Sequence, residues 1–223
     1  MWEGSFDRAH TKRLLRPPYT LQPDTISPFC VHACCVLPVC ESSAMALTAT
    51  IYKAELTVSD MDRDYYATHN LTVALHPSET ESRMMLRLLA FALNAHEDLA
   101  FSRGLSNPEE PDLWQRHPND TLAHWIELGM PDEKRLRKAC GLAEQVTLYC
   151  YGPRAPQVWW DSMKNKVRRF DNLTIIHVDA DSEATLATCA QRAMQLQAMI
   201  QDGQVWFGTT EQSEEITLSQ WYP

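Results

Sequence analysis

Between residues 122 and 178 the sequence alternates between strand patterns and helical patterns, and this succession constrains the fold more than any other feature. The short apolar runs are HWIELG, VTLYCY and LTIIHVD, and the segments between them, PDEKRLRKACGLAEQ and APQVWWDSMKNKV, have the spacing of helices. Strands that are separated by helices can pair in parallel, because each helix carries the chain back across the sheet. The pattern therefore predicts a partly parallel sheet with helices on its faces.

Strand pairs are expected at both ends of this region. ATIYKAELTVSD and YYATHNLTVALH predict an antiparallel hairpin, and QVWFG with EITLSQW predicts a closing hairpin. A helix is expected after Ser78 as N-cap, with Glu81 completing a capping box, and another over 182–201 with Ser182 as N-cap and Gly203 after its end. The fold class expected is a single α/β domain with a mixed central sheet flanked by helices.

The first 44 residues differ from the rest of the chain. They contain five prolines and show no sustained period, which predicts that residues 1–44 are disordered or are a non-native upstream extension. Met45 opens MALTATIYKAEL, where the strand pattern begins at once. The folded domain is therefore expected over residues 45–223.

Charge and hydropathy limit the partners and the location of the chain. The formal net charge of -9 disfavours general contact with nucleic acid or anionic membranes. No stretch of about 18 apolar residues occurs, and the amino terminus lacks the pattern of a secretory signal, so a cytoplasmic protein without membrane contact is expected.

Any contact with nucleic acid must then be local. The basic tracts EKRLRK (133–138) and KNKVRRF (164–170) could bind phosphates beside Trp159 and Trp160, whose rings offer stacking surfaces. The alternative is that both tracts are solvated helix faces and that the tryptophans belong to the core. A protein is the alternative to nucleic acid as a binding partner.

Several chemistries lack their sequence patterns. None of the seven glycines falls in a phosphate-binding loop. The sequence also has neither a GxSxG nucleophile elbow nor an HExxH zinc helix. What remains is a set of three carboxylates: Glu79 or Glu81 at the start of a helix, Asp112, and Glu127. Mg²⁺ prefers hard oxygen ligands, so these three are the candidate metal ligands, and the bound ion could activate a water for attack on a phosphodiester.

The order of these acids resembles the PD-(D/E)XK nuclease motif. In that motif a helix carrying Glu precedes Pro-Asp, and a Glu-x-Lys follows; here Pro111-Asp112 is followed by Glu127, 15 residues later. The motif's lysine is replaced by Gly129. Lys134 or Lys138 on the next helix could supply the missing ammonium group as catalytic residues, although their spacing equally fits a solvated basic face.

Longer stretches resemble the YaeQ family of bacterial proteins from Met45 to the carboxyl terminus. They include MALTATIYKAEL, LTVALHPSET, EPDLW and WIELGMPDEKRLRKA. The resemblance implies the PD-(D/E)XK nuclease-like fold without an assigned substrate, and by motif it carries the family's acidic positions onto Glu79, Asp112 and Glu127.

Each candidate also has a purely structural explanation. Glu79 could pair with Arg83 or favour the helix dipole, and Asp112 could cap a turn. Glu127 in an apolar strand could form a buried salt bridge with Arg135, Lys134 or Lys138. Two functions therefore stay open, a Mg²⁺-dependent phosphodiesterase acting on nucleic acid and a non-catalytic binding or regulatory protein on a degenerate nuclease scaffold.

Overall fold

The computed structural model describes residues 49–103, 107 and 109–223 of the chain. The prediction made for residues 1–44 lies outside these residues. The described part is an α/β domain that contains two mixed sheets and four helices.

The first sheet, sheet A, has the strand order β10-β9-β8-β1-β2. Its strands are β1 (Thr50–Asp60), β2 (Tyr65–Leu75), β8 (Ala193–Gln201), β9 (Gln204–Thr209) and β10 (Ser213–Glu215). The predicted β1–β2 hairpin is present and antiparallel, and β8 joins β1 in parallel. Sheet A therefore places the first two strands of the described domain beside β8, a strand that comes much later in the sequence.

The second sheet, sheet B, has the order β11-β7-β6-β5-β4-β3. Its strands are β3 (Leu99–Phe101), β4 (Leu113–Arg116), β5 (Leu122–Leu128), β6 (Ala143–Tyr151), β7 (Leu173–Val178) and β11 (Leu218–Tyr222). The three strands β5, β6 and β7 run parallel, whereas β3, β4 and β5 form an antiparallel meander. The parallel part is the one that the alternation of strands and helices predicted.

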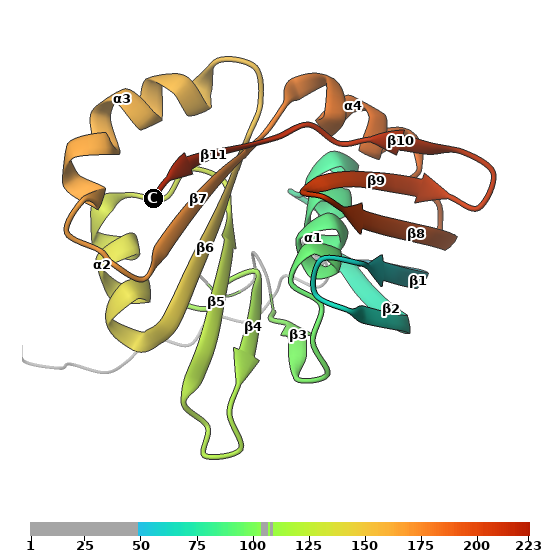
Figure 1. Cartoon of the computed structure of the whole chain (residues 1–223), viewed down its shortest axis with the longest axis horizontal. Coiled ribbons are helices and arrows are strands. Elements are labelled where there is room, and N and C mark those ends of the chain that lie inside the picture. Colours follow the sequence, from blue (N-terminus) through green and yellow to red (C-terminus); the bar gives the residue numbers. More distant parts are fainter. Residues whose placement is uncertain (1–48, 104–106, 108) are drawn as a thin grey trace, which may run out of the picture. The chain divides into compact units, whose positions relative to one another are not determined.

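The helices fall into two pairs. They are α1 (Glu81–Leu93), α2 (Glu133–Leu142), α3 (Ala155–Val167) and α4 (Ala180–Thr188). Figure 1 shows α1 between the two sheets, and α2 with α3 on the far face of sheet B. None of the helices in the described part of the chain is both long and apolar enough to cross a membrane.

Two apolar cores follow from this layering. One joins the inner face of sheet A, α1 and one face of sheet B, while the other joins the opposite face of sheet B to α2 and α3. Because α1 has a sheet on either side, its residues from Met84 to Ala92 are all buried, Arg87 included. The buried surface of α1 is therefore wider than one apolar stripe, and it includes an arginine.

The helix predicted over 182–201 is wrong in its second half. The structure ends α4 at Thr188 and makes 193–201 the strand β8, and Asp179 rather than Ser182 is the N-cap. Met194, Leu196, Ala198 and Ile200 are buried in alternation with more exposed neighbours, which is the two-residue period of a strand. The Ser182 hydroxyl instead accepts the N–H of Thr217.

The expectation of one central sheet and a closing hairpin is also wrong. Strand β9 pairs with β8 and β10 in sheet A, whereas β11 leaves that sheet and pairs with β7 in sheet B. The chain between them therefore crosses from one sheet to the other. A strand's apolar alternation does not say which sheet it joins, so the sequence pattern could not separate the two arrangements.

Candidate functional site

Glu79 lies immediately before α1 and is held by two arginines of that helix. Its Oε1 accepts from Arg83 Nη1 at 2.9 Å, and its Oε2 accepts from Arg87 Nη2 at 2.9 Å. The N-cap of α1 is Thr80, which accepts from the Arg83 N–H, so the predicted capping box of Ser78 and Glu81 is wrong. The Ser78 hydroxyl bonds to the His76 ring, and the Glu81 carboxylate accepts from the Tyr52 hydroxyl.

Asp112 lies just before β4 and is 3% exposed. Its Oδ1 accepts from Arg83 Nη2 at 2.6 Å, and its Oδ2 accepts from the backbone N–H of Leu128 in β5 at 2.8 Å. The Arg83 guanidinium therefore bridges the carboxylates of Glu79 and Asp112 and ties α1 to sheet B. Burial lowers the pKa of Arg83, but Asp112 and Glu79 more than offset this effect, so its pKa is raised and it stays charged.

Glu127 lies in β5 and forms a two-pronged pair with Arg135 of α2. Its Oε1 accepts from Arg135 Nε at 2.7 Å, and its Oε2 accepts from Arg135 Nη2 at 2.9 Å and from Trp125 Nε1 at 3.0 Å. Burial raises the pKa of this carboxyl group, and the hydrogen bonds from Arg135 oppose that rise. The buried salt bridge to Arg135 that the sequence left open is the arrangement observed.

Asp112 and Glu127 line one hollow of about 350 Å³, together with Arg83 and Arg135. Glu79 is linked to it through Arg83. The structure thus connects the three predicted acids, but each of their six carboxylate oxygens already accepts an N–H. Three arginines balance the three acids, so the cluster has no net negative charge.

This arrangement does not fit a Mg²⁺ ion. Mg²⁺ requires near-octahedral oxygen ligation, and a guanidinium group lying between two carboxylates repels a cation from the same place. Among the residues that the structure describes, no three His, Cys, Asp or Glu side chains are grouped so that they could hold a metal ion.

The two lysines proposed for catalysis lie on α2, away from the Glu127 carboxylate. Lys138 pairs with Glu109 on the segment before β4, and this contact lowers the pKa of Glu109. Lys134 is exposed and also acts on Glu109 through its charge. The cation that contacts Glu127 is Arg135 rather than either lysine.

Gly129, which stands where the resemblance to the nuclease motif would place a lysine, has a backbone φ of 112°. Side-chain-bearing residues rarely adopt this conformation, because the Cβ atom collides with the backbone. The backbone conformation at this position therefore disfavours a lysine, in agreement with the glycine found in the sequence.

Replacing this glycine, Gly129→Lys, is expected to lower the free energy of unfolding by about 1–3 kcal/mol, because the lysine would be forced into that strained conformation. The change is measured by denaturant unfolding. Gly141→Lys is the matched control, since Gly141 lies in α2 without a positive φ and has open space around its Cα; it should be neutral or mildly stabilising. Equal stability of the two variants would contradict the expectation.

Arg87 is the residue of this cluster that sequence reasoning missed. It lies within the apolar run MMLRLLAF and is 3% exposed, and besides Glu79 its Nη2 donates to the Ala74 carbonyl. The available signal was an arginine in an apolar helix, one turn after Arg83, since a buried arginine requires an anionic partner.

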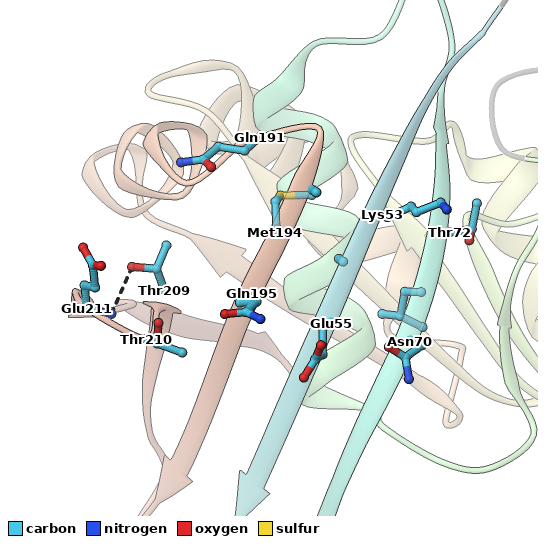
Figure 2. Close-up of a pocket in the computed structure, with 13 residues that line it drawn as sticks. Lys53, Glu55, Asn70, Thr72, Gln191, Met194, Gln195, Thr209, Thr210 and Glu211 are labelled. Atoms are coloured by element: carbon cyan, nitrogen blue, oxygen red, sulfur yellow. Dashed lines mark hydrogen bonds between the residues drawn. The ribbon is translucent and has the colours of Figure 1, made fainter.

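A larger hollow of about 790 Å³ lies over the outer face of sheet A. Figure 2 shows Lys53 and Glu55 from β1 with Asn70 and Thr72 from β2, and the Glu211 N–H bonding to Thr209 at its other side. Most of its other labelled side chains are uncharged amides or hydroxyls, and none of the predicted site residues line it. The carboxylate–arginine cluster is therefore the better candidate site.

Comparison with known proteins places these features in a family. The family model described as YaeQ protein matches residues 45–218. The chain is 48% identical over 177 residues to "Uncharacterized protein YaeQ" of Salmonella typhi and 46% identical to that of Escherichia coli K12, covering 79% of this chain and 98% of each relative.

Solved structures agree with this similarity. The crystal structure of the YaeQ protein from Xanthomonas axonopodis pv. citri matches with a TM-score of 0.76 and 46% identity, covering 78% of this chain and 98% of that chain. The YaeQ protein from Pseudomonas syringae matches with a TM-score of 0.75 and 37% identity, covering 78% and 97%.

Proposed function

This chain belongs to the YaeQ family, and we propose that it is a non-catalytic binding protein built on a PD-(D/E)XK nuclease-like scaffold. The scaffold assignment is supported by the order of the elements. Helix α1 follows Glu79, Asp112 precedes β4, and Glu127 lies in β5, which pairs with β4. The acids therefore follow the order of the nuclease motif, although Glu79 lies just before the helix and not on it.

The observation that carries the non-catalytic proposal is the neutralisation of all three acids by arginine. A divalent ion could enter only if Arg83 and Arg135 released their carboxylates, which would leave buried charges without partners. The conformation of Gly129 supports the same reading, because it disfavours the lysine that would assist an attacking water. The residues thus stabilise the junction of α1, β4, β5 and α2 rather than a metal.

A cleavage assay tests this proposal. Supercoiled plasmid, single-stranded DNA and single-stranded RNA are incubated with the purified chain and Mg²⁺ or Mn²⁺. We expect no cleavage beyond that of Asp112→Asn and Glu127→Gln, which keep the shape of the side chains. Cleavage that requires the divalent ion and disappears in both folded variants would overturn the proposal.

The second candidate is a Mg²⁺-dependent phosphodiesterase, and one observation favours it. Asp112 and Glu127 face a common hollow beside Met130 and Pro131, as the acids of such a site would. This candidate requires the two arginines of the hollow to leave their carboxylates when substrate and ion bind. The cleavage assay separates it from the binding protein.

A further inference from the structure

Positive charge gathers on one face of an otherwise acidic protein. Residues 133–169 carry nine Lys and Arg side chains against three Asp and Glu, a net charge of +6, whereas the whole chain carries -9. These residues include α2 and α3, which lie together on the far face of sheet B (Figure 1). The α2–α3 surface, defined here as the exposed side chains of 133–170, is therefore a local attractor for anions.

Three of these cationic side chains converge on the Glu133 carboxylate, in the first turn of α2. Arg137 Nη2 donates to its carboxylate at 2.9 Å, Lys166 Nζ lies 3.6 Å from it, and Arg169 also donates to it. One carboxylate thus faces three cations from two helices and the segment that follows α3. Two positive charges are left over at this point, and the carboxylate itself marks where an anion can lie.

A hollow of about 470 Å³ adjoins this cluster. Arg137 and Arg169 line it together with Phe170 and Asn172, and the Arg169 guanidinium lies 4.8 Å from the centre of the Phe170 ring. The Asn172 side chain is fixed, because its Nδ2 donates to the carbonyls of Cys140 and Ala143. The hollow is shallow and open, with room for a nucleotide base. It presents the Arg169 guanidinium over the partly buried Phe170 ring and the Asn172 amide, and the exposed Asp171 carboxylate also lines it.

These features complement a nucleotide, which carries an anionic phosphate beside a flat base. Guanidinium groups bind phosphate in two-pronged geometry, and bases stack on aromatic rings or on guanidinium planes. A base can reach such a hollow only if it is not paired, which favours a single strand over a duplex. Resting on the non-catalytic role above, we propose that the α2–α3 surface binds single-stranded nucleic acid, with a phosphate on Arg137, Lys166 and Arg169 and a base in the hollow, on the guanidinium and ring that Arg169 and Phe170 present there.

Fluorescence anisotropy with a labelled single-stranded oligonucleotide tests this inference, using the full chain with EDTA present. Arg137→Glu/Arg169→Glu should weaken binding at least tenfold and flatten its salt dependence, since phosphate contacts are lost. Lys53→Glu/Arg192→Glu, which makes the same change in charge at sheet A, should change affinity much less. Glu133→Gln should strengthen binding, because it removes the carboxylate that competes with phosphate.

Each of the following results would overturn the inference: no binding by the wild-type chain, equal loss in both double variants, or weaker binding by a folded Glu133→Gln protein. Duplex DNA or inorganic polyphosphate bound as tightly as the single strand would also overturn it, because the base would then contribute nothing. None of these results bears on catalysis, which the cleavage assay decides separately. Circular dichroism confirms that each variant is folded before its affinity is compared.

Discussion

Arg83→Ala is expected to lower the free energy of unfolding by about 3–5 kcal/mol, the range for removing one partner of a buried ion pair. The Glu79 and Asp112 side chains are only 2% and 4% exposed, and Arg83 bonds to both. Without the guanidinium, Asp112 keeps its bond from the Leu128 N–H but loses its cationic partner. Denaturant unfolding monitored by circular dichroism measures the change.

Two further variants make this result specific. Arg83→Lys keeps the charge but cannot bridge two carboxylates, so an intermediate loss is expected. Arg116→Ala removes an exposed partner of Asp120 and should cost less than about 1 kcal/mol. A loss for Arg83→Ala no larger than that for Arg116→Ala would show that the bridge does not hold α1 to sheet B.

The second large effect is expected in acid and comes from His124 of β5. Partial burial lowers the pKa of His124 from its ordinary value of 6.5 to about 4, and its Nε2 lies 2.8 Å from the Thr147 hydroxyl in β6. Between these two values the unfolded chain binds a proton that the folded chain does not. Stability is therefore retained above about pH 6.5 and falls by about 3 kcal/mol as the pH drops to about 4.

His124→Gln should remove this part of the acid dependence, because glutamine does not titrate in this range. The free energy of unfolding is measured from pH 7 to pH 4 for the wild type and the variant. His117→Gln, which replaces a more exposed histidine, serves as the control and should keep most of the wild-type slope. Parallel curves for wild type and His124→Gln would contradict the partly buried, neutral state of His124.

The sequence predicted the local elements where a single period dominates. The segment that became α3 was predicted at its observed bounds, and the strands LTIIHV and VTLYCY were found because they are short, apolar and rich in β-branched or aromatic residues. The failure at 193–201 has a physical cause. Leu186, Ala190, Ala193 and Ile200 follow a helical spacing, whereas burial over 193–201 follows the two-residue alternation that pairing with β1 imposes.

Most residues of the candidate site were predictable from the sequence, but their arrangement in space was not. Spacing along the chain identified Asp112, Glu127 and either Glu79 or Glu81, and the resemblance to the family selected Glu79. Spacing also suggested Arg83 as a partner of Glu79, and Arg135 as one of three possible partners of Glu127. It could not show that one guanidinium bridges Glu79 and Asp112, because those acids are 33 positions apart and are joined only by tertiary packing. Nor could it indicate the φ of Gly129, which depends on how β5 turns toward α2.

Measuring the thermal unfolding midpoint with and without Mg²⁺ shows whether the three carboxylates bind only arginine or can also bind the metal ion. Samples at matched ionic strength are compared for the wild type and for Asp112→Asn. No rise in midpoint with Mg²⁺ is expected in either protein, since a ligand stabilises a fold only if the folded state binds it. A rise that grows with Mg²⁺ concentration in the wild type and is absent in Asp112→Asn would contradict this expectation.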